Sequence, residues 1–220
     1  MEGERRLTRV AFLVDGFNLY HSIKETHACT GCNYRWLDIY SLCESFLSAL
    51  GGASELQSVH YFSAFAYHRE HWNPGTVSRH RVYVKALEST GVVPHLAVFK
   101  PRTVGYRCSN CGHRGSFVRH EEKETDVAIA ATMVELAVKA GTDAVAIVSG
   151  DTDLIPALRA FRSLSHAAAY VLFPYLRANA AFDGVASSTF RLKEQSYANH
   201  QLPDPVQSPF GPIHRPASWG

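Results

Sequence analysis

The chain has 220 residues, a formal net charge of +2 and a charged fraction of 19%. These values are typical of one globular α/β domain with a full core, and the chain is short for two independent domains. A charge this small excludes a basic field over the whole molecule, so any nucleic-acid binding must depend on a local patch.

The N-terminal stretch Met1–Arg9 is polar and charged, without the apolar region and small-residue cleavage site of a secretory signal. The longest apolar run, Ala144–Val148, is the length of a strand and far too short to cross a membrane. We therefore expect a cytoplasmic protein with no membrane partner. Four of the five cysteines stand in Cys-x-x-Cys pairs, which in such a chain favours a metal over disulfides.

The first half of the chain alternates apolar, strand-length runs with segments of helical spacing. Glycines at 51, 52 and 91 end two of these helical segments. The predicted strands are Arg9–Asp15, Val59–Tyr67 and Val92–Lys100, and the predicted helices are Phe17–Glu25, Asp38–Leu50 and Val77–Thr90.

The second half is interrupted by a polar, basic segment, 101–120, which we predict to be a loop. The alternation then resumes, which indicates β-α-β units and a mainly parallel sheet. From Ser196 the pattern ends, and the proline content predicts an extended or disordered tail, 196–220, after a domain of residues 1–195. The predicted elements are helices Thr125–Ala140, Asp151–Ser163 and Ala178–Val185, and strands Ala144–Val148, Ala167–Phe173 and Thr189–Leu192.

Four aspartates follow strands or begin helices. Asp15 ends the first strand, Asp151 and Asp153 follow the strand Ala144–Val148, and Asp126 begins the long helix. The carboxyl ends of parallel strands share one edge, so these groups converge if the two strands are neighbours. Crowded carboxylates need a counter-ion, and Mg²⁺ or Mn²⁺ prefers oxygen ligands and supports phosphodiester hydrolysis with one or two ions. Taken singly, each aspartate has a structural alternative as a turn residue or helix cap.

Three motifs around these residues are similar in order and spacing to the NYN (LabA-like) domain, which resembles PIN nucleases. The resemblance covers Arg9 to Leu192 and implies a PIN-like, Rossmannoid three-layer sandwich with strand order 3-2-1-4-5. One departure is Glu124, where the family often has glycine. The motifs are Val14-Asp15-Gly16-Phe17-Asn18-Leu19, Lys123-Glu124-Thr125-Asp126-Val127 and Ser149-Gly150-Asp151-Thr152-Asp153-Leu154.

The resemblance also implies roles for individual residues. Asp15, Asp126, Asp151 and Asp153 become ligands of the catalytic metal ion. Asn18 becomes a hydrogen-bonding group for a water, a ligand or the scissile phosphate.

The cysteine pairs Cys29-Thr-Gly-Cys32 and Cys108-Ser-Asn-Cys111 have the spacing of zinc knuckles. We predict one structural Zn²⁺ on all four sulfurs, holding the loops 27–36 and 101–120 together as a small insertion. Redox dithiols and two unrelated thiol pairs are the alternatives. Full four-cysteine ligation leaves no open position, so this ion is not expected to take part in catalysis.

Basic residues gather in the stretch 100–123 together with Tyr106 and Phe117. Cationic side chains bind phosphates and aromatic rings stack on unpaired bases, so this stretch predicts a single-strand binding tract. The alternative is a solvated loop whose charges serve solubility. The predicted nucleic-acid contacts are Lys100, Arg102, Arg107, Arg114, Arg119 and Lys123.

Together these features predict a metal-dependent endoribonuclease that hydrolyses RNA with a metal-activated water, using Mg²⁺ or Mn²⁺ beside a structural Zn²⁺. RNA is preferred over DNA by the family resemblance alone. The alternative function is a non-catalytic RNA-binding or regulatory module that keeps the fold. The sequence is compatible with a homodimer.

Overall fold

A seven-stranded sheet runs through the centre of the molecule, in the strand order β4-β3-β2-β1-β5-β6-β7. The computed structural model describes residues 7–51, 53–139 and 141–220, so Gly52 and Ala140, at two predicted helix ends, lie outside it. Every neighbouring pair is parallel except β3 and β4. The strands are β1 (Thr8–Asp15), β2 (Ser54–Ala64), β3 (Val92–Arg107), β4 (Arg114–Lys123), β5 (Ala144–Val148), β6 (Ala168–Phe173) and β7 (Ser188–Arg191).

The predicted strand order is confirmed. Its five strands correspond to β3-β2-β1-β5-β6, and the structure places β4 at one edge and β7, the predicted strand Thr189–Leu192, at the other. β1 and β5 are neighbours, with Val14 opposite Val148 in the register. Their carboxyl ends therefore lie side by side, which is the arrangement that the acidic site needs.

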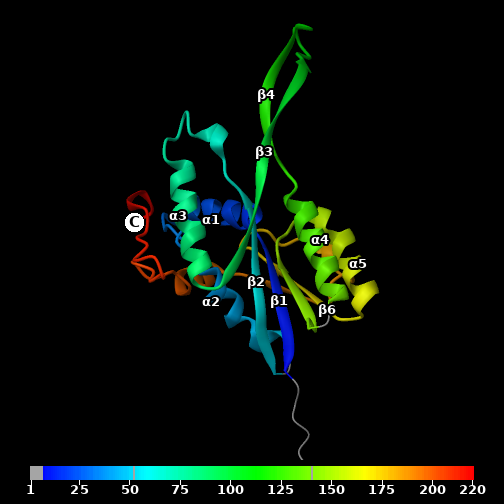
Figure 1. Ribbon diagram of the computed structural model, residues 1–220. Coiled ribbons are helices and arrows are strands. Elements are labelled where there is room, and N and C mark those ends of the chain that lie inside the picture. The colour runs from blue at the N-terminus through cyan, green and yellow to red at the C-terminus, as the bar shows by residue number, and fades with distance from the viewer. Residues whose placement is uncertain (1–6, 52, 140) are drawn as a thin grey trace, which may run out of the picture.

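Helices cover both faces of the sheet and complete the predicted three-layer sandwich (Figure 1). α1, α2 and α3 lie on one face, and α4 and α5 lie on the other. The helices are α1 (Gly16–Thr30), α2 (Ile39–Ser45), α3 (Thr76–Ser89), α4 (Thr125–Val138), α5 (Ile155–Ser165) and α6 (Glu194–Asn199), with short 3₁₀ turns η1 (Leu47–Leu50), η2 (Tyr67–Arg69), η3 (Thr152–Leu154), η4 (Ala180–Phe182) and η5 (Ala217–Trp219).

Each face of the sheet has its own apolar core. Leu19 and Ile23 of α1 pack in one core, whereas Ile129 of α4 and Phe161 of α5 pack in the other. All five residues of β5 are buried, as expected of a central parallel strand covered on both faces. Burying one such large side chain contributes about 1.5–3 kcal/mol, so the two cores hold the sheet edge in place.

The segment 101–120 is not the predicted loop. β3 continues to Arg107 and pairs antiparallel with β4, from Val98 opposite Lys123 to Arg107 opposite Arg114. This ribbon, which we call the arm (residues 98–123), projects away from the layers (Figure 1). The sequence misled us because most of the arm is exposed on both faces, so it lacks the alternation of apolar and polar residues that marks a half-buried strand.

The C-terminal segment is extended and packs against the face that carries α1 to α3. The backbone N–H of Leu202 donates to the carbonyl of Trp36 at 2.9 Å, and both Leu202 and Val206 are buried. Trp219 packs its ring against Trp36 and Tyr83, with centroids 6.4 and 5.9 Å away. Among the described residues, no helix has the length and apolarity needed to cross a membrane.

Candidate active site at the carboxyl edge of the sheet

Asp15 is the most enclosed carboxylate of the site, with only 4% of its surface exposed. One carboxylate oxygen accepts from the backbone N–H groups of Phe17 and Asn18, at 3.1 and 2.9 Å, and so caps α1. The other oxygen accepts from the hydroxyl of Ser149 at 2.8 Å, just beyond β5. Burial raises the pKa of Asp15, and the nearby charges of Asp126 and Asp151 raise it further.

The predicted partners of Asp15 lie at the same edge. Asp151 receives the backbone N–H of Asp153 at 3.0 Å and so caps η3. The pKa of Asp126 is raised first by burial and then by the charges of Asp151 and Asp153. The charges of Asp126 and Asp151 thus act on Asp15, and those of Asp151 and Asp153 act on Asp126. We call this group, with Glu122 added below, the acidic rim.

Two glycines allow the elements of the rim to approach closely. A Cβ atom on Gly16 would lie 2.5 Å from the ring of Tyr61 and 2.6 Å from the carbonyl of Phe62. A Cβ atom on Gly150 would collide with the carbonyl oxygen of Arg177. Any side chain at either position would push a loop of the rim out of place.

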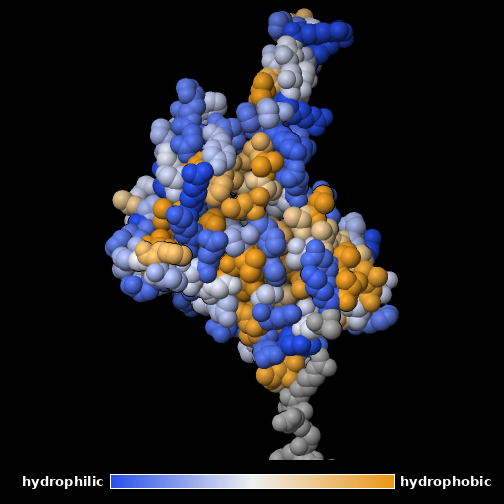
Figure 2. Space-filling model, in the orientation of Figure 1, coloured by the Kyte–Doolittle hydropathy of each residue, from blue (hydrophilic) through white to orange (hydrophobic). Residues whose placement is uncertain are grey.

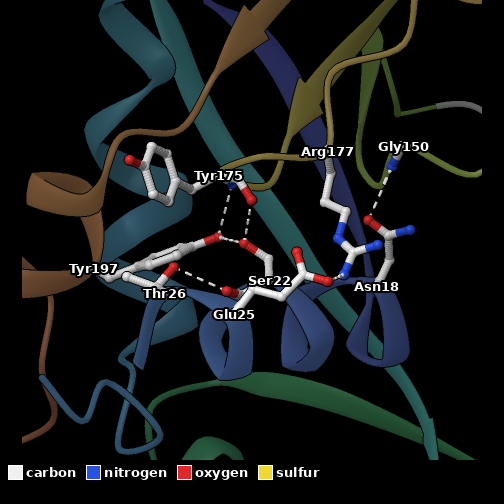
Figure 3. Close-up of polar contacts among 8 residues, drawn as sticks. All are labelled: Asn18, Ser22, Glu25, Thr26, Gly150, Tyr175, Arg177 and Tyr197. Carbon is white, nitrogen blue, oxygen red and sulfur yellow. Dashed lines mark hydrogen bonds and ion pairs between the residues drawn. The ribbon is translucent and has the colours of Figure 1, made fainter. Parts of the chain in front are cut away.

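Asn18 links α1 to the loop after β5, because its side-chain carbonyl accepts the backbone N–H of Gly150 at 3.1 Å (Figure 3). This positioning contact was not revealed by the sequence, and the predicted contact of Asn18 with a water, a ligand or the scissile phosphate stays a prediction. The amide NH₂ group of Asn18 is the part able to donate to a ligand.

The loop that packs under Gly150 is itself fixed to α1. Ser22 donates to the carbonyl of Tyr175 at 2.6 Å and shares a hydrogen bond of 2.7 Å with the hydroxyl of Tyr197. Arg177 forms an ion pair with Glu25 at 2.5 Å, and Figure 3 shows both groups arranged along one side of α1. These contacts explain how a loop distant in sequence holds the rim in position.

Glu122, near the end of β4, is a rim carboxylate that sequence reasoning missed. It receives a short hydrogen bond from Thr125, which directly precedes Asp126. Burial raises the pKa of Glu122 to about 7, and the charges of Asp15 and Asp126 add to the increase. Its position opposite Phe99 in the register turns it to the inner face of the arm, and this placement follows only once β3 and β4 are paired.

Comparison with known proteins identifies the family. The sequence matches the NYN domain over residues 9–188, which is most of the chain. The chain belongs to the NYN domain family. NYN proteins have a PIN-like fold and are generally nucleases. No protein of curated function matches the chain.

One solved structure similar to this NYN chain is VPA0982, a protein of unknown function from Vibrio parahaemolyticus. The two share 18% identity with a TM-score of 0.56, over 90% of this chain and 99% of the other. At this identity the likeness supports the PIN-like fold alone.

Glu124 occupies the position where NYN sequences often have glycine. Its φ of 83° is in the left-handed region that glycine adopts readily, at the start of α4. The backbone conformation suited to glycine is therefore present, at a cost of about 1–2 kcal/mol for a residue with a Cβ atom. The Glu124 carboxylate forms an ion pair with Lys100 at 2.7 Å, and Lys123 pairs with Glu121 at 3.0 Å.

The rim fits a hard divalent cation in the chemistry of its donors, which are all carboxylates. Among the described residues, no three Asp, Glu, His or Cys side chains are gathered closely enough to ligate one ion together. Mg²⁺ keeps several of its waters and usually takes only one or two carboxylates directly. A site of this kind therefore needs fewer than three carboxylates in direct contact with the ion.

The prediction of a single four-cysteine zinc site is not confirmed by the structure. Cys29 lies in the last turn of α1, whereas Cys108 and Cys111 lie in the turn at the tip of the arm. Pairing of β3 with β4 carries the second pair away from the layers in which α1 lies (Figure 1). Within the described ranges the four sulfurs form no metal-binding group.

The arm arranges the predicted basic residues on two faces. Lys100, Arg102, Arg119 and Lys123 share one face with Tyr106 and Phe117, since residues directly opposite in an antiparallel pair point to the same side. Arg107 and Arg114 pair near the tip on the other face. Tyr106 and Phe117 are about half exposed, with ring centroids 6.3 Å apart. The end of the arm is covered mainly by hydrophilic residues (Figure 2).

Proposed function

We propose that this NYN protein is a metal-dependent endoribonuclease with its active site at the acidic rim. The observation that carries the proposal is the convergence of Asp15, Asp126, Asp151 and Asp153, at the family's motif positions, on one sheet edge. A buried carboxylate surrounded by like charges is costly unless a cation or a proton is present.

Asp15, Asp126, Asp151 and Asp153 are the residues that would hold Mg²⁺ or Mn²⁺. When bound, such an ion lowers the pKa of a water and neutralises charge on phosphoryl oxygens. Asp15 has little freedom to move because it accepts three hydrogen bonds. Preorganised charge of this kind requires no rearrangement at the moment of reaction.

Glu122 is suited to proton transfer. In the metal-free protein its pKa of about 7 allows its carboxyl group to hold or release a proton near neutral pH. It lies close enough to Asp15 and Asp126 for their charges to act on it. We assign it the task of exchanging a proton with the attacking water or the leaving group.

The arm supplies an RNA-binding surface. Lys100, Arg102 and Arg119 would contact phosphates along one face, and Tyr106 and Phe117 would stack on unpaired bases. Glu121 neutralises part of the positive charge of the arm, because its carboxylate pairs with both Arg102 and Lys123. Single-stranded RNA is the substrate class that this combination and the family favour.

The test is cleavage of a labelled single-stranded RNA pool with Mn²⁺, with Mg²⁺ and with a chelator. We expect cleavage that requires the ion and is lost in Asp15→Asn, with RNA binding retained. Circular dichroism checks that the variant is folded, and Asp126→Asn is the second variant because Asp126 is less buried than Asp15. RNA binding without cleavage in any metal would instead favour the non-catalytic module.

A further inference from the structure

A cavity of about 350 Å³ lies beside the acidic rim, enclosed by α1, the end of β2, α3 and η5. Its lining includes Gly16 and Phe17, the two residues that follow Asp15 in the chain. Its volume falls within the range of about 300–1,000 Å³ typical of small-molecule sites. Figure 2 shows apolar surface on this side, between α3 and the base of the arm. The cavity thus includes the two residues next to Asp15 in the chain, and none of the rim carboxylates lines it.

The charge of the cavity is opposite to that of the rim. Arg35, Arg69 and Arg79 line it, and its described lining contains no aspartate or glutamate. Arg79 is occupied, donating to the carbonyl of Pro74 and the side chain of Asn73, each at 3.0 Å. The Nε atom of Arg35 is buried and has no hydrogen-bond partner within the described part of the chain. A buried donor in this state is best satisfied by an anionic acceptor.

Two histidines also line the cavity without adding charge at neutral pH. Burial lowers the pKa of His80 to about 4. Burial also lowers the pKa of His21, with further lowering by the charges of Arg177, Lys24 and Arg69. A neutral imidazole offers one donor and one acceptor, which suits the edge of a heterocyclic base.

Aromatic rings form much of the remaining wall. Tyr20 is 41% exposed, and Tyr83 meets Trp219 with ring centroids 5.9 Å apart at 69°. Phe99 of the arm closes one side, 5.6 Å from the ring of Phe17. Rings presented in this way stack on any nucleobase, whatever its identity.

We propose that this cavity binds one nucleotide of the substrate strand, with its base among the aromatic rings and a phosphate at Arg35 and Arg69. The assignment to the substrate strand rests on the proposed nuclease function. Phe17 lines the cavity next to Asp15, so a strand held there would pass directly to the rim. An uncharged aromatic ligand would leave the buried donor of Arg35 unsatisfied.

The test is calorimetric binding of adenosine 5′-monophosphate to the full chain in the presence of a chelator, so that no cleavage takes place. We expect Arg35→Gln and Tyr20→Ala each to weaken binding about tenfold. Arg69→Gln is the second charge variant, because its exposed side chain can be changed without disturbing the core. The matched control is Arg81→Gln, which removes the same charge from an exposed site outside the cavity, where Arg81 contacts Tyr67 at 2.7 Å.

A 2′-O-methyl RNA oligonucleotide is then added as a competitor. Displacement of the mononucleotide supports a subsite for the strand, and failure of a binding oligonucleotide to displace it overturns that assignment. Equal binding of unphosphorylated adenosine, or equal weakening by Arg81→Gln, overturns the nucleotide site. If the protein binds the mononucleotide but cleaves no RNA, the assignment of the cavity as a nucleotide site stands. Only the nuclease proposal is then contradicted.

Discussion

Asp15 at the rim is buried and accepts three hydrogen bonds, whereas Arg102 on the arm is two-thirds exposed and pairs with one carboxylate at 3.4 Å. The rim is built around the buried carboxylate of Asp15, and the pKa values of Asp15, Glu122 and Asp126 are raised by burial and by neighbouring carboxylates. The arm is built by strand pairing in solvent, where charges act almost independently and are screened by salt. Substitutions in the rim should therefore have large, residue-specific effects on cleavage. Substitutions on the arm should have graded, additive effects on RNA binding.

The largest effect is expected from Asp151→Asn. Removing this charge from the rim should lower the cleavage rate by on the order of 10³, because charge aimed at the reacting group acts in the transition state. Single-turnover cleavage measures it, with RNA affinity measured in parallel. The matched control is Asp183→Asn, an exposed aspartate at the end of η4, which should cleave at the wild-type rate. Equal losses in both variants would break the distinction between the rim and the rest of the surface.

The next effect belongs to the arm. Arg102→Gln combined with Arg119→Gln should weaken single-stranded RNA binding about 10- to 100-fold at physiological salt and reduce the salt slope by about 1.4. Fluorescence anisotropy over a salt series measures both quantities. Arg107→Gln combined with Arg114→Gln removes equal charge from the opposite face and should weaken binding less. If the two pairs behave alike, the arm is a diffuse basic tract without a binding face.

Asn18→Ala tests the contact between α1 and the loop after β5. Losing the acceptor for the N–H of Gly150 should lower the free energy of unfolding by about 1–3 kcal/mol. Urea unfolding measures this loss. Asn199→Ala removes an amide whose partner, Gln195, is exposed, and serves as the control. No difference between the variants would mean that the Asn18 contact does not hold the rim.

The smallest effect is expected from Glu122→Gln in the metal-free protein. It is a gain in the free energy of unfolding, whereas Asn18→Ala causes a loss. The folded-state pKa of Glu122 is raised from 4.5 to about 7, so the folded state loses stability as pH rises from about 4.5 to 7. The glutamine variant should be more stable by about 1 kcal/mol near pH 8, after allowance for partial exposure, and unchanged near pH 4.

The matched control for that prediction is the neighbouring Glu121→Gln. The pKa of Glu121 is lowered, first by Lys123 and also by Arg102, so its ionised form stabilises the fold. This variant should lose stability at high pH, the reverse of Glu122→Gln. Urea unfolding near pH 4 and near pH 8 measures the change in stability of each variant. A change of the same sign in both variants would contradict the assignment of Glu122 to the rim.

The sequence predicted the layers and the rim because burial leaves a strong pattern. The buried run ending at Asp15 and the apolar strand before Ser149 identified β1 and β5. The family's strand order then placed them together, as confirmed. The arm carries no such pattern, because both faces of its ribbon are exposed to solvent. Its length therefore could not be predicted from the sequence and follows from the pairing of β3 with β4.

The missed features share one cause, which is dependence on contacts between distant segments. From the sequence alone, Glu122 looks like a charge in solvent. Pairing of β4 with β3 brings it within reach of the charge of Asp15. The cavity joins Arg35, Arg69 and Trp219 from three separate parts of the chain. The single zinc site is not confirmed for a related reason, because knuckle spacing describes each cysteine pair but says nothing of where the two pairs lie.

The central claim is that the rim carboxylates bind a divalent cation, and calorimetric titration with Mn²⁺ in the absence of RNA tests it most directly. Wild-type protein should bind Mn²⁺, and Asp126→Asn, which changes a residue less buried than Asp15, should bind it at least tenfold more weakly while remaining folded. Mn²⁺ binding that is unchanged in Asp126→Asn, or absent from the wild-type protein, would contradict the account.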